Sequence, residues 1–223
     1  MKRCLRFHLQ ALFSLWWLPL LPPVLGLLMG WEAASALGAY LRRAGPADAR
    51  SALAFVLDIR HFVPLSGAAW AAAFLGPEFD GRVPALLLSR GFSRFQVFVS
   101  KLLLFMVGCA VVSLSAQTTA VFPVFSVGQP LPPGFLLRCF FLRLALDLGM
   151  MAPSAAIVSF AGDNLYGRAI VGLYGLLFWR LMGSHYGLWL PEAGAPGITA
   201  LWPLYALPLS ALCCFLALRR KEF

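Results

Sequence analysis

The stretch GPEFDGRVPALLLSRGFSRFQVFVSK, residues 76–101, contains a charged island, 78–101, between two long apolar runs. A helix of about 20 apolar residues is long enough to cross a bilayer core. A charged island between two such runs therefore predicts a segment outside the bilayer that joins two membrane-spanning helices. Around a short apolar centre, 83–88, the island carries Glu78, Asp80, Arg82, Arg90, Arg94 and Lys101.

The composition of the whole chain is typical of an integral membrane protein. Of the 223 residues, 61% are hydrophobic and only 12% are charged, and the mean hydropathy is +0.80. Soluble domains carry about 25% charged residues. The formal net charge is +9, but the basic residues lie at the ends of apolar runs, where anionic lipid head groups attract them. We therefore expect a lipid bilayer, and no nucleic acid, as the partner of these charges.

The apolar runs predict an all-α integral membrane protein, with residues 1–223 forming one transmembrane domain. The second run is the least clear, because its uncharged part, 62–76, covers only about 22 Å at 1.5 Å per residue. Its helix is therefore expected to take in Asp58, Arg60 and His61. The six expected transmembrane helices lie at about 11–30, 58–77, 102–125, 136–161, 169–186 and 198–218.

The distribution of basic residues predicts that both termini and the island lie in the cytoplasm. With this orientation, 11 of the 18 basic residues fall in inner segments. Arg42, Arg43 and Arg50 in the expected outer segment oppose it, while the short basic tails favour it. The inner basic residues are Lys2, Arg3, Arg6, Arg82, Arg90, Arg94, Lys101, Arg168, Arg219, Arg220 and Lys221.

Prolines and small residues predict local features within the first two spans. Pro19, Pro22 and Pro23 remove backbone donors and predict a kink. Gly26 and Gly30 form a GxxxG pair, a spacing that lets two helices approach closely. A second group of small residues predicts tight packing of the second span, namely Gly67, Ala68, Ala71 and Ala72.

Arg143 and Asp147 are charged residues inside the expected fourth span. Their i, i+4 spacing places them on one helix face, where they can pair. Ionisable residues at membrane depth are rare and frequently functional. Two interpretations stay open: a structural ion pair, or a polar lining of a substrate path.

Catalytic signatures are missing from the sequence. There is no GxxxxGK[ST] phosphate-binding loop, no HExxH and no GxSxG, so we do not expect this chain to hydrolyse ATP by itself. His8, His61 and His185 fall on both expected sides of the membrane, and the five cysteines lack the spacing of a disulfide framework or zinc site. We expect no catalytic residue, metal or cofactor in this chain.

The chain resembles the permease subunits of type-2 ABC exporters. The resemblance rests on the six expected spans together with motifs in and beside the island: Gly76, Glu78 and Gly81, then the apolar run 85–88, then Gly91-Phe92-Ser93-Arg94, then Ser100-Lys101-Leu102. A short turn with Asn164 after the fourth span extends the resemblance. The chain departs from the family in having one residue fewer between Glu78 and Gly81, and in Arg82, where the family usually has Thr.

The resemblance implies that 78–101 is a coupling segment, which contains a short cytoplasmic helix between the second and third spans. In this family a separate ATP-binding cassette subunit, which holds ATP and Mg, grips that helix. Leucines 86–88 would supply apolar anchors for a groove on the partner, and the arginines would pair with acidic residues. The implied contact residues are Glu78, Gly81, Arg82, Leu86, Leu87, Arg90, Ser93 and Arg94.

The function that follows is the permease half of an ATP-driven exporter in the bacterial inner (plasma) membrane, working as a homo- or heterodimer. Few charges face the expected interior, so an amphiphilic or hydrophobic cargo (peptide, lipid-like or drug-like) is favoured over a small ion. Two alternatives stay open: a permease like the haem exporters of cytochrome c maturation, and a non-transporting membrane scaffold or immunity protein. The missing catalytic groups disfavour a membrane-embedded enzyme.

Overall fold

The computed structural model describes residues 2–44, 63–75, 87–126, 133–161, 165–183 and 202–220. Within these ranges the secondary structure is helical and contains no strand, which confirms the all-α prediction for this part of the chain. The elements are α1 (Lys2–Ser14), α2 (Leu21–Ala44), α4 (Val63–Phe74), α6 (Arg94–Ser126), α7 (Pro133–Ala161), α8 (Leu165–Gly183) and α9 (Trp202–Arg220).

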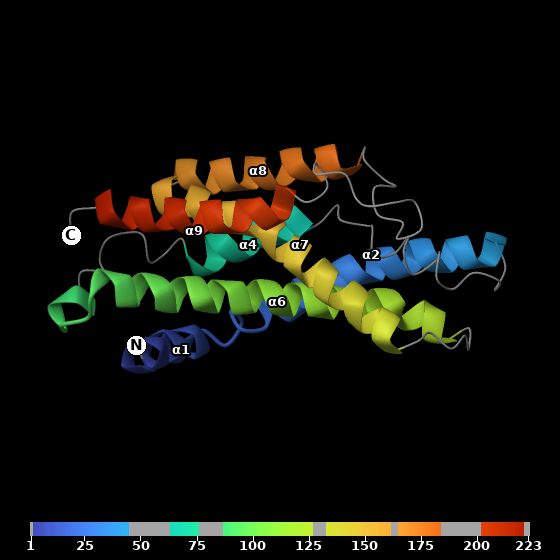
Figure 1. The fold of residues 1–223 in the computed structure, drawn as a ribbon, viewed down its shortest axis with the longest axis horizontal. Coiled ribbons are helices and arrows are strands. Elements are labelled where there is room, and N and C mark those ends of the chain that lie inside the picture. The colour runs from blue at the N-terminus through green and yellow to red at the C-terminus, as the bar shows by residue number, and fades with distance from the viewer. Residues whose placement is uncertain are drawn as a thin grey trace.

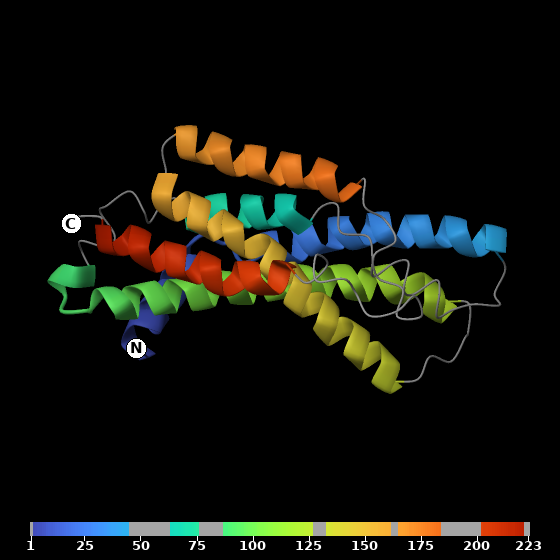
Figure 2. The same ribbon diagram turned by 45° about the horizontal axis from the view of Figure 1, so that its top comes forward.

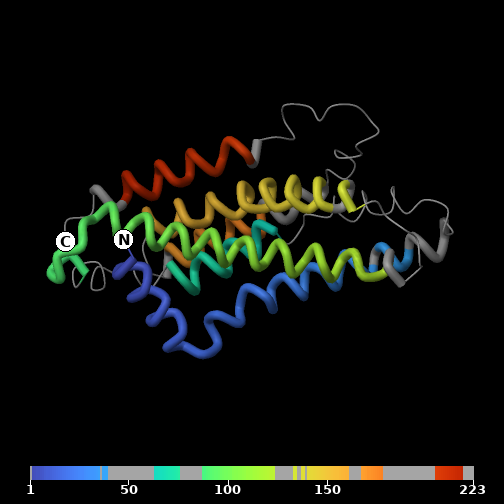
Figure 3. The backbone as a smooth tube through the Cα atoms, turned by 60° about the horizontal axis from the view of Figure 1, so that its bottom comes forward, coloured from blue at the N-terminus to red at the C-terminus, as the bar shows by residue number. Residues whose placement is uncertain are grey.

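The helices form an elongated bundle (Figure 1). Followed along the chain, α2, α4, α6, α7, α8 and α9 run in alternating directions along its long axis (Figures 1 and 2). As a result, α1, the start of α6 and the end of α9 lie at the same end of the bundle, which we call the α1 end. Figure 3 shows α1 and α2 on one side of the bundle and α9 on the opposite side.

Two of the described helices are long and apolar enough to cross a membrane, judged by length and composition. These are α6 over Arg94–Pro123 and α7 over Phe140–Phe160. Three other helices carry shorter apolar stretches, at Val63–Phe74, Gly167–Leu177 and Leu204–Ala217. The membrane character expected from the composition is thus found in two helices of the described part of the chain.

The expected first span, 11–30, is not one continuous helix. Helix α1 ends at Ser14, a turn follows, and α2 begins at Leu21. Pro19 lies in the turn, while Pro22 and Pro23 lie in the first turn of α2, where a missing N–H leaves no hydrogen bond unmade. The prolines therefore break the helix rather than kink it.

The third span starts earlier than expected, because α6 begins at Arg94 rather than near 102. Ser93 and Gln96 cap it reciprocally: the Gln96 backbone N–H donates to Ser93 Oγ, and the Ser93 backbone N–H donates to Gln96 Oε1, both at 3.2 Å. This capping box satisfies two N–H groups at the helix start. The last eight residues of the segment 78–101 are consequently the first turns of α6.

The other expected spans differ from the observed helices by a few residues at their ends. Helix α7 begins at Pro133 and α8 at Leu165, each slightly before its expected span, whereas α9 begins at Trp202, after the expected start. Parts of three expected spans lie outside the described residues, at 58–62, 76–77, 184–186 and 198–201.

Helix α4 packs in the middle of the bundle, against α2, α6, α7 and α8. Its Trp70 is buried, stacks on Phe74 with ring centroids 4.8 Å apart, and donates its indole Nε1–H to the Phe105 carbonyl at 3.1 Å. The indole lies directly against Gly108, where a Cβ would collide with it. The glycine thus makes room for the largest side chain of the core.

Glycines also bring α2 and α6 together. A Cβ at Gly26 would lie 2.6 Å from Ser115 Cβ, and a Cβ at Gly30 would lie 2.6 Å from Thr119 Cβ. The prediction that the GxxxG pair permits a close helix contact is confirmed. Gly67 in α4 plays the same part against Met151 of α7, with 2.7 Å between the added Cβ and Met151 Cβ.

Candidate functional site

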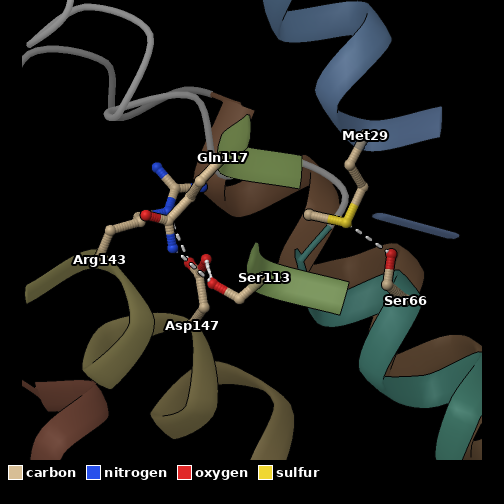
Figure 4. A network of polar contacts seen from close by, with 6 residues as sticks. All are labelled: Met29, Ser66, Ser113, Gln117, Arg143 and Asp147. Carbon is tan, nitrogen blue, oxygen red and sulfur yellow. Dashed lines mark hydrogen bonds and ion pairs between the residues drawn. The ribbon is translucent and has the colours of Figure 1, made fainter. Parts of the chain in front are cut away.

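A buried polar network joins α6 and α7. Arg143 Nε donates to Asp147 Oδ1 at 2.7 Å, so the pair expected from the i, i+4 spacing is present (Figure 4). Ser113 Oγ donates to the other carboxylate oxygen, Oδ2, at 2.6 Å, and Gln117 Nε2 donates to Ser113 Oγ at 2.8 Å. The four side chains form one chain of hydrogen bonds that crosses the interface between the two helices.

The network is shielded from the surroundings of the bundle. Arg143 is 7% exposed and Asp147 is 1% exposed, while Ser113 and Gln117 are buried. A buried carboxylate is tolerated only when it is paired and hydrogen-bonded, and here both oxygens of Asp147 accept a bond. The arrangement therefore fixes the register between α6 and α7 electrostatically as well as by packing.

The network lies inside the apolar stretches of both helices. Asp147 is seven residues, or about 10 Å at 1.5 Å per residue, from the start of the stretch Phe140–Phe160. Gln117 is six residues, or about 9 Å, from the end of the stretch Arg94–Pro123. Both distances are measured from the end of the bundle opposite α1, so the network lies in the far half of the bundle.

Ahead of α6, the described part of the segment 78–101 is a capped turn at the α1 end, Leu87–Ser93. The Phe92 N–H donates to the Leu87 carbonyl at 3.2 Å, and the Gly91 N–H donates to the Leu88 carbonyl at 3.0 Å. This is the hydrogen-bond pattern of a Schellman motif, which needs a left-handed residue at its C′ position. Gly91 supplies it with φ of +81°. The chain then enters α6 through the Ser93 capping box.

Leu87 fixes this turn to the rest of the protein. It is fully buried in a cluster with Cys4 of α1 and Val97 of α6, against which Phe7 and Phe92 also pack. The resemblance implies that Leu87 is a surface anchor for a partner, and the structure corrects this: the side chain is covered by α1 and by Phe92 of its own Schellman motif. Leu87 is an internal anchor.

The polar residues of the turn are on the surface. Arg90, Ser93 and Arg94 are exposed, and the Arg90 guanidinium lies 5.9 Å from the Phe7 ring centroid. The exposure of these three residues leaves the prediction that they contact a partner open. The other expected contact residues, Glu78, Gly81, Arg82 and Leu86, lie outside the described residues.

A second set of buried polar side chains lies between α1 and α6, about two helical turns after the start of α6. Lys101 is 7% exposed, and its Nζ lies 4.3 Å from the centroid of the Phe74 ring of α4, a cation–π contact. Across from it, His8 of α1 is buried, and burial together with the charge of Lys101 lowers the pKa of His8 to about 3. His8 is therefore neutral at neutral pH. A Cys4 Sγ–Ser100 Oγ contact at 3.3 Å completes the joint between α1 and α6.

The sequence alone gives no role to several residues of these sites. Ser113 and Gln117 stand out only as polar residues in an apolar run, and nothing in the sequence pairs them with Asp147 of another helix. The packing of α1 on the turn Leu87–Ser93 was also not predicted, although the i, i+4 spacing of Cys4 and His8 is a usable signal, because both occupy one face. Among the residues that the structure describes, no three His, Cys, Asp or Glu side chains gather to hold a metal ion.

Comparison with known proteins found no matching family model, no matching curated protein and no matching solved structure.

Proposed function

We propose that this chain is the permease subunit of an ATP-driven exporter of the type-2 ABC class. In this proposal the bundle crosses the bacterial plasma membrane six times, with the α1 end in the cytoplasm. The chain works as a dimer with a separate ATP-binding cassette subunit, which supplies the ATP, the Mg and the hydrolysis. The cargo is amphiphilic or hydrophobic.

The observation that carries the proposal is the rigid turn Leu87–Ser93. It presents Arg90 and Arg94 outward, is anchored inward by Leu87, and continues without a break into α6 through the Ser93 capping box. A Schellman motif is a common helix end, but here it is combined with a capping box and with a buried anchor that ties the turn to α1. A surface that receives force from a partner needs both, because a flexible segment would absorb the displacement.

The surface of the bundle supports its placement in a membrane. Large apolar side chains are exposed along α2, α6, α8 and α9, which is unfavourable in water and typical of lipid-facing helices. The alternating directions of six helices place both described chain ends at the α1 end, together with the turn. The exposed leucines among these side chains include Leu27, Leu28, Leu103, Leu173, Leu176, Leu177, Leu209 and Leu212.

The contacts suggest how a displacement of the turn would spread. A push on Arg90 and Arg94 moves the start of α6 and, through Leu87, α1. It also reaches α4, because Lys101 lies on Phe74 and Phe74 stacks on Trp70. The polar network in the far half of the bundle holds α6 to α7, so movement of α6 is carried to α7. The helices around α4 would thus move together.

The proposal is tested by charge reversal at the turn. The double variant Arg90→Glu/Arg94→Glu is purified with an affinity tag from its native membrane, next to the wild type. The wild type is expected to bring down a nucleotide-hydrolysing subunit, detected by mass spectrometry and by phosphate release. The variant is expected to lose at least tenfold of that subunit, since two attractive charges become repulsive.

The matched control is Arg138→Glu, which reverses an exposed arginine at the far end of α7. It should retain the partner at the wild-type level. If the wild type brings down no ATPase, or if the turn variant retains it as fully as Arg138→Glu, the coupling proposal fails.

A further inference from the structure

A groove runs between α2 and α4 on the outside of the bundle. It has a volume of about 510 Å³ and is open along one side. That volume falls within the roughly 300–1,000 Å³ of pockets for drug-sized molecules. The wall is formed by Leu25, Leu28, Met29 and Glu32 of α2 and by Leu65, Ser66 and Ala69 of α4.

The floor of the groove is fixed by a contact between the two helices. Ser66 Oγ donates to Met29 Sδ at 2.9 Å, and both side chains are buried (Figure 4). Leu28 stands 66% exposed on the rim. The groove is therefore a formed feature whose floor is closed and whose apolar rim is accessible.

Among the described residues that line this groove, Glu32 is the one ionisable residue. It lies on the same helix face as Leu25, Leu28 and Met29, at the i, i+3, i+4 and i+7 positions. Its Oε2 atom is buried and has no hydrogen-bond partner among the described residues. A buried carboxylate oxygen without a donor is unfavourable unless something else supplies one. The described residues of the wall include no lysine or arginine.

We propose that the groove binds a lipophilic cation, with the apolar body of the ligand against the leucines and its positive charge at the carboxylate of Glu32. The proposal rests on the proposed function, because it names the cargo class that the permease would take from the bilayer. Charge selects the ligand: a neutral or anionic molecule of the same shape would leave the Glu32 carboxylate without a partner or meet it with repulsion.

The test uses two probes of nearly equal size and opposite charge, tetraphenylphosphonium and tetraphenylborate. Each is titrated by equilibrium dialysis against the purified full-length chain in detergent micelles, without ATP or any partner. Saturable binding of tetraphenylphosphonium is expected at about one molecule per chain, and tetraphenylborate should show only the uptake of the micelle. Equal saturable binding of both probes, or of neither, would overturn the proposal.

Two variants locate the bound cation. Glu32→Gln keeps the shape of the side chain and should raise the Kd for tetraphenylphosphonium by about tenfold or more, which corresponds to 1.4 kcal/mol. Ala69→Trp fills the groove and should abolish saturable binding. Leu176→Trp, which places the same bulk on the exposed face of α8, should bind as the wild type does. Unchanged affinity in Glu32→Gln would contradict the assigned site.

Further measurements distinguish a lipid from a separate amphiphile as the bound cation, and a failure of this proposal from a failure of the proposed function. Excess phosphatidylethanolamine in the micelles distinguishes two sources of the cation: competition identifies an amine-bearing lipid, and retained binding identifies a separate amphiphile. Binding of the cation is measured without the ATPase. A negative binding result therefore does not change the recovery of the ATPase in the Arg90→Glu/Arg94→Glu experiment, and a failure to recover the ATPase does not change the binding result. Each variant is first checked for a monodisperse elution; if Glu32→Gln aggregates, the comparison of the two probes on the wild type still decides the proposal.

Discussion

Replacing Asp147 with Asn tests the buried network between α6 and α7. The change keeps the shape of the side chain but removes its charge, so the buried guanidinium of Arg143 loses its counter-ion. Two charge-assisted hydrogen bonds are affected, from Arg143 Nε at 2.7 Å and from Ser113 Oγ at 2.6 Å. An amide oxygen can still accept one of them.

The expected loss follows from these two bonds. Hydrogen bonds to charged groups contribute about 1.5–3 kcal/mol each, and removing one partner of a buried ion pair costs about 3–5 kcal/mol. Since Asn keeps one acceptor, we expect Asp147→Asn to lower the free energy of unfolding by about 3 kcal/mol. At 2–4 °C per kcal/mol for a chain of this size, the melting temperature should fall by roughly 6–12 °C.

The assay is unfolding in mixed micelles, followed by circular dichroism, for Asp147→Asn, Arg143→Met and the apolar pair Arg143→Met/Asp147→Leu. The apolar pair should recover most of the loss, because no buried charge remains. The coupling energy between the two positions should exceed about 2 kcal/mol. A loss below about 1 kcal/mol in Asp147→Asn, or a double variant as unstable as the sum of the singles, would refute this account of the network.

Three further predictions concern α2, the cap of α6 and α1. Gly26→Ala should lower the free energy of unfolding by about 1–3 kcal/mol, because the added Cβ meets α6. Gly38→Ala, where the added Cβ meets open space, should be neutral or stabilising by up to about 1 kcal/mol. Equal effects of the two variants in the melting assay would contradict the close contact. Ser93→Ala should cost about 1 kcal/mol and raise proteolysis of the turn Leu87–Ser93, and an unchanged cleavage rate would argue against a rigid turn. The folded pKa of His8, about 3, lies below its unfolded value of 6.5. The unfolded state therefore takes up the proton first, and stability that is complete above pH 6.5 should fall by about 2 kcal/mol at pH 5. His8→Leu should remove this part of the pH dependence. If the variant loses as much stability between pH 6.5 and pH 5 as the wild type does, the lowered pKa of His8 is contradicted.

Much of the helical architecture could be predicted because it rests on local patterns. Apolar length predicts α4, α6, α7, α8 and α9 apart from their ends, but not the break between α1 and α2 or the continuation of α2 to Ala44. The i, i+4 spacing predicts the pair of Arg143 and Asp147, and the GxxxG spacing predicts the contact of Gly26 and Gly30. Each pattern needs only the period of an α-helix. The observed start of α6 at Arg94 was also readable in principle, since Ser93 and Gln96 have the spacing of a capping box.

The rest depends on contacts between distant parts of the chain. Leu87 is apolar and lies in a charged stretch, so its sequence fits an anchor for a partner as well as an anchor for α1. Only the packing of Cys4 and Phe7 of α1 against Leu87 shows that Leu87 is an anchor for α1. In the same way, the sequence shows that Ser113 is polar but not that it faces Asp147, which is 34 residues away. The sequence shows Glu32 only as one acidic residue in a polar stretch. The groove exists because α4 packs beside α2 and places Ser66 and Ala69 next to the helix face that carries Glu32.

The most direct test of the central claim is photo-crosslinking in intact cells. A photoreactive benzoylphenylalanine is introduced at Arg90 in the turn and, as control, at Arg138 at the far end. We predict an adduct from position 90 that contains a protein with a GxxxxGK[ST] phosphate-binding loop, and no such adduct from position 138. An adduct pattern that is the same at both positions, or the absence of a nucleotide-binding protein from the adduct at position 90, would contradict the claim that this turn receives the energy of ATP hydrolysis from a partner.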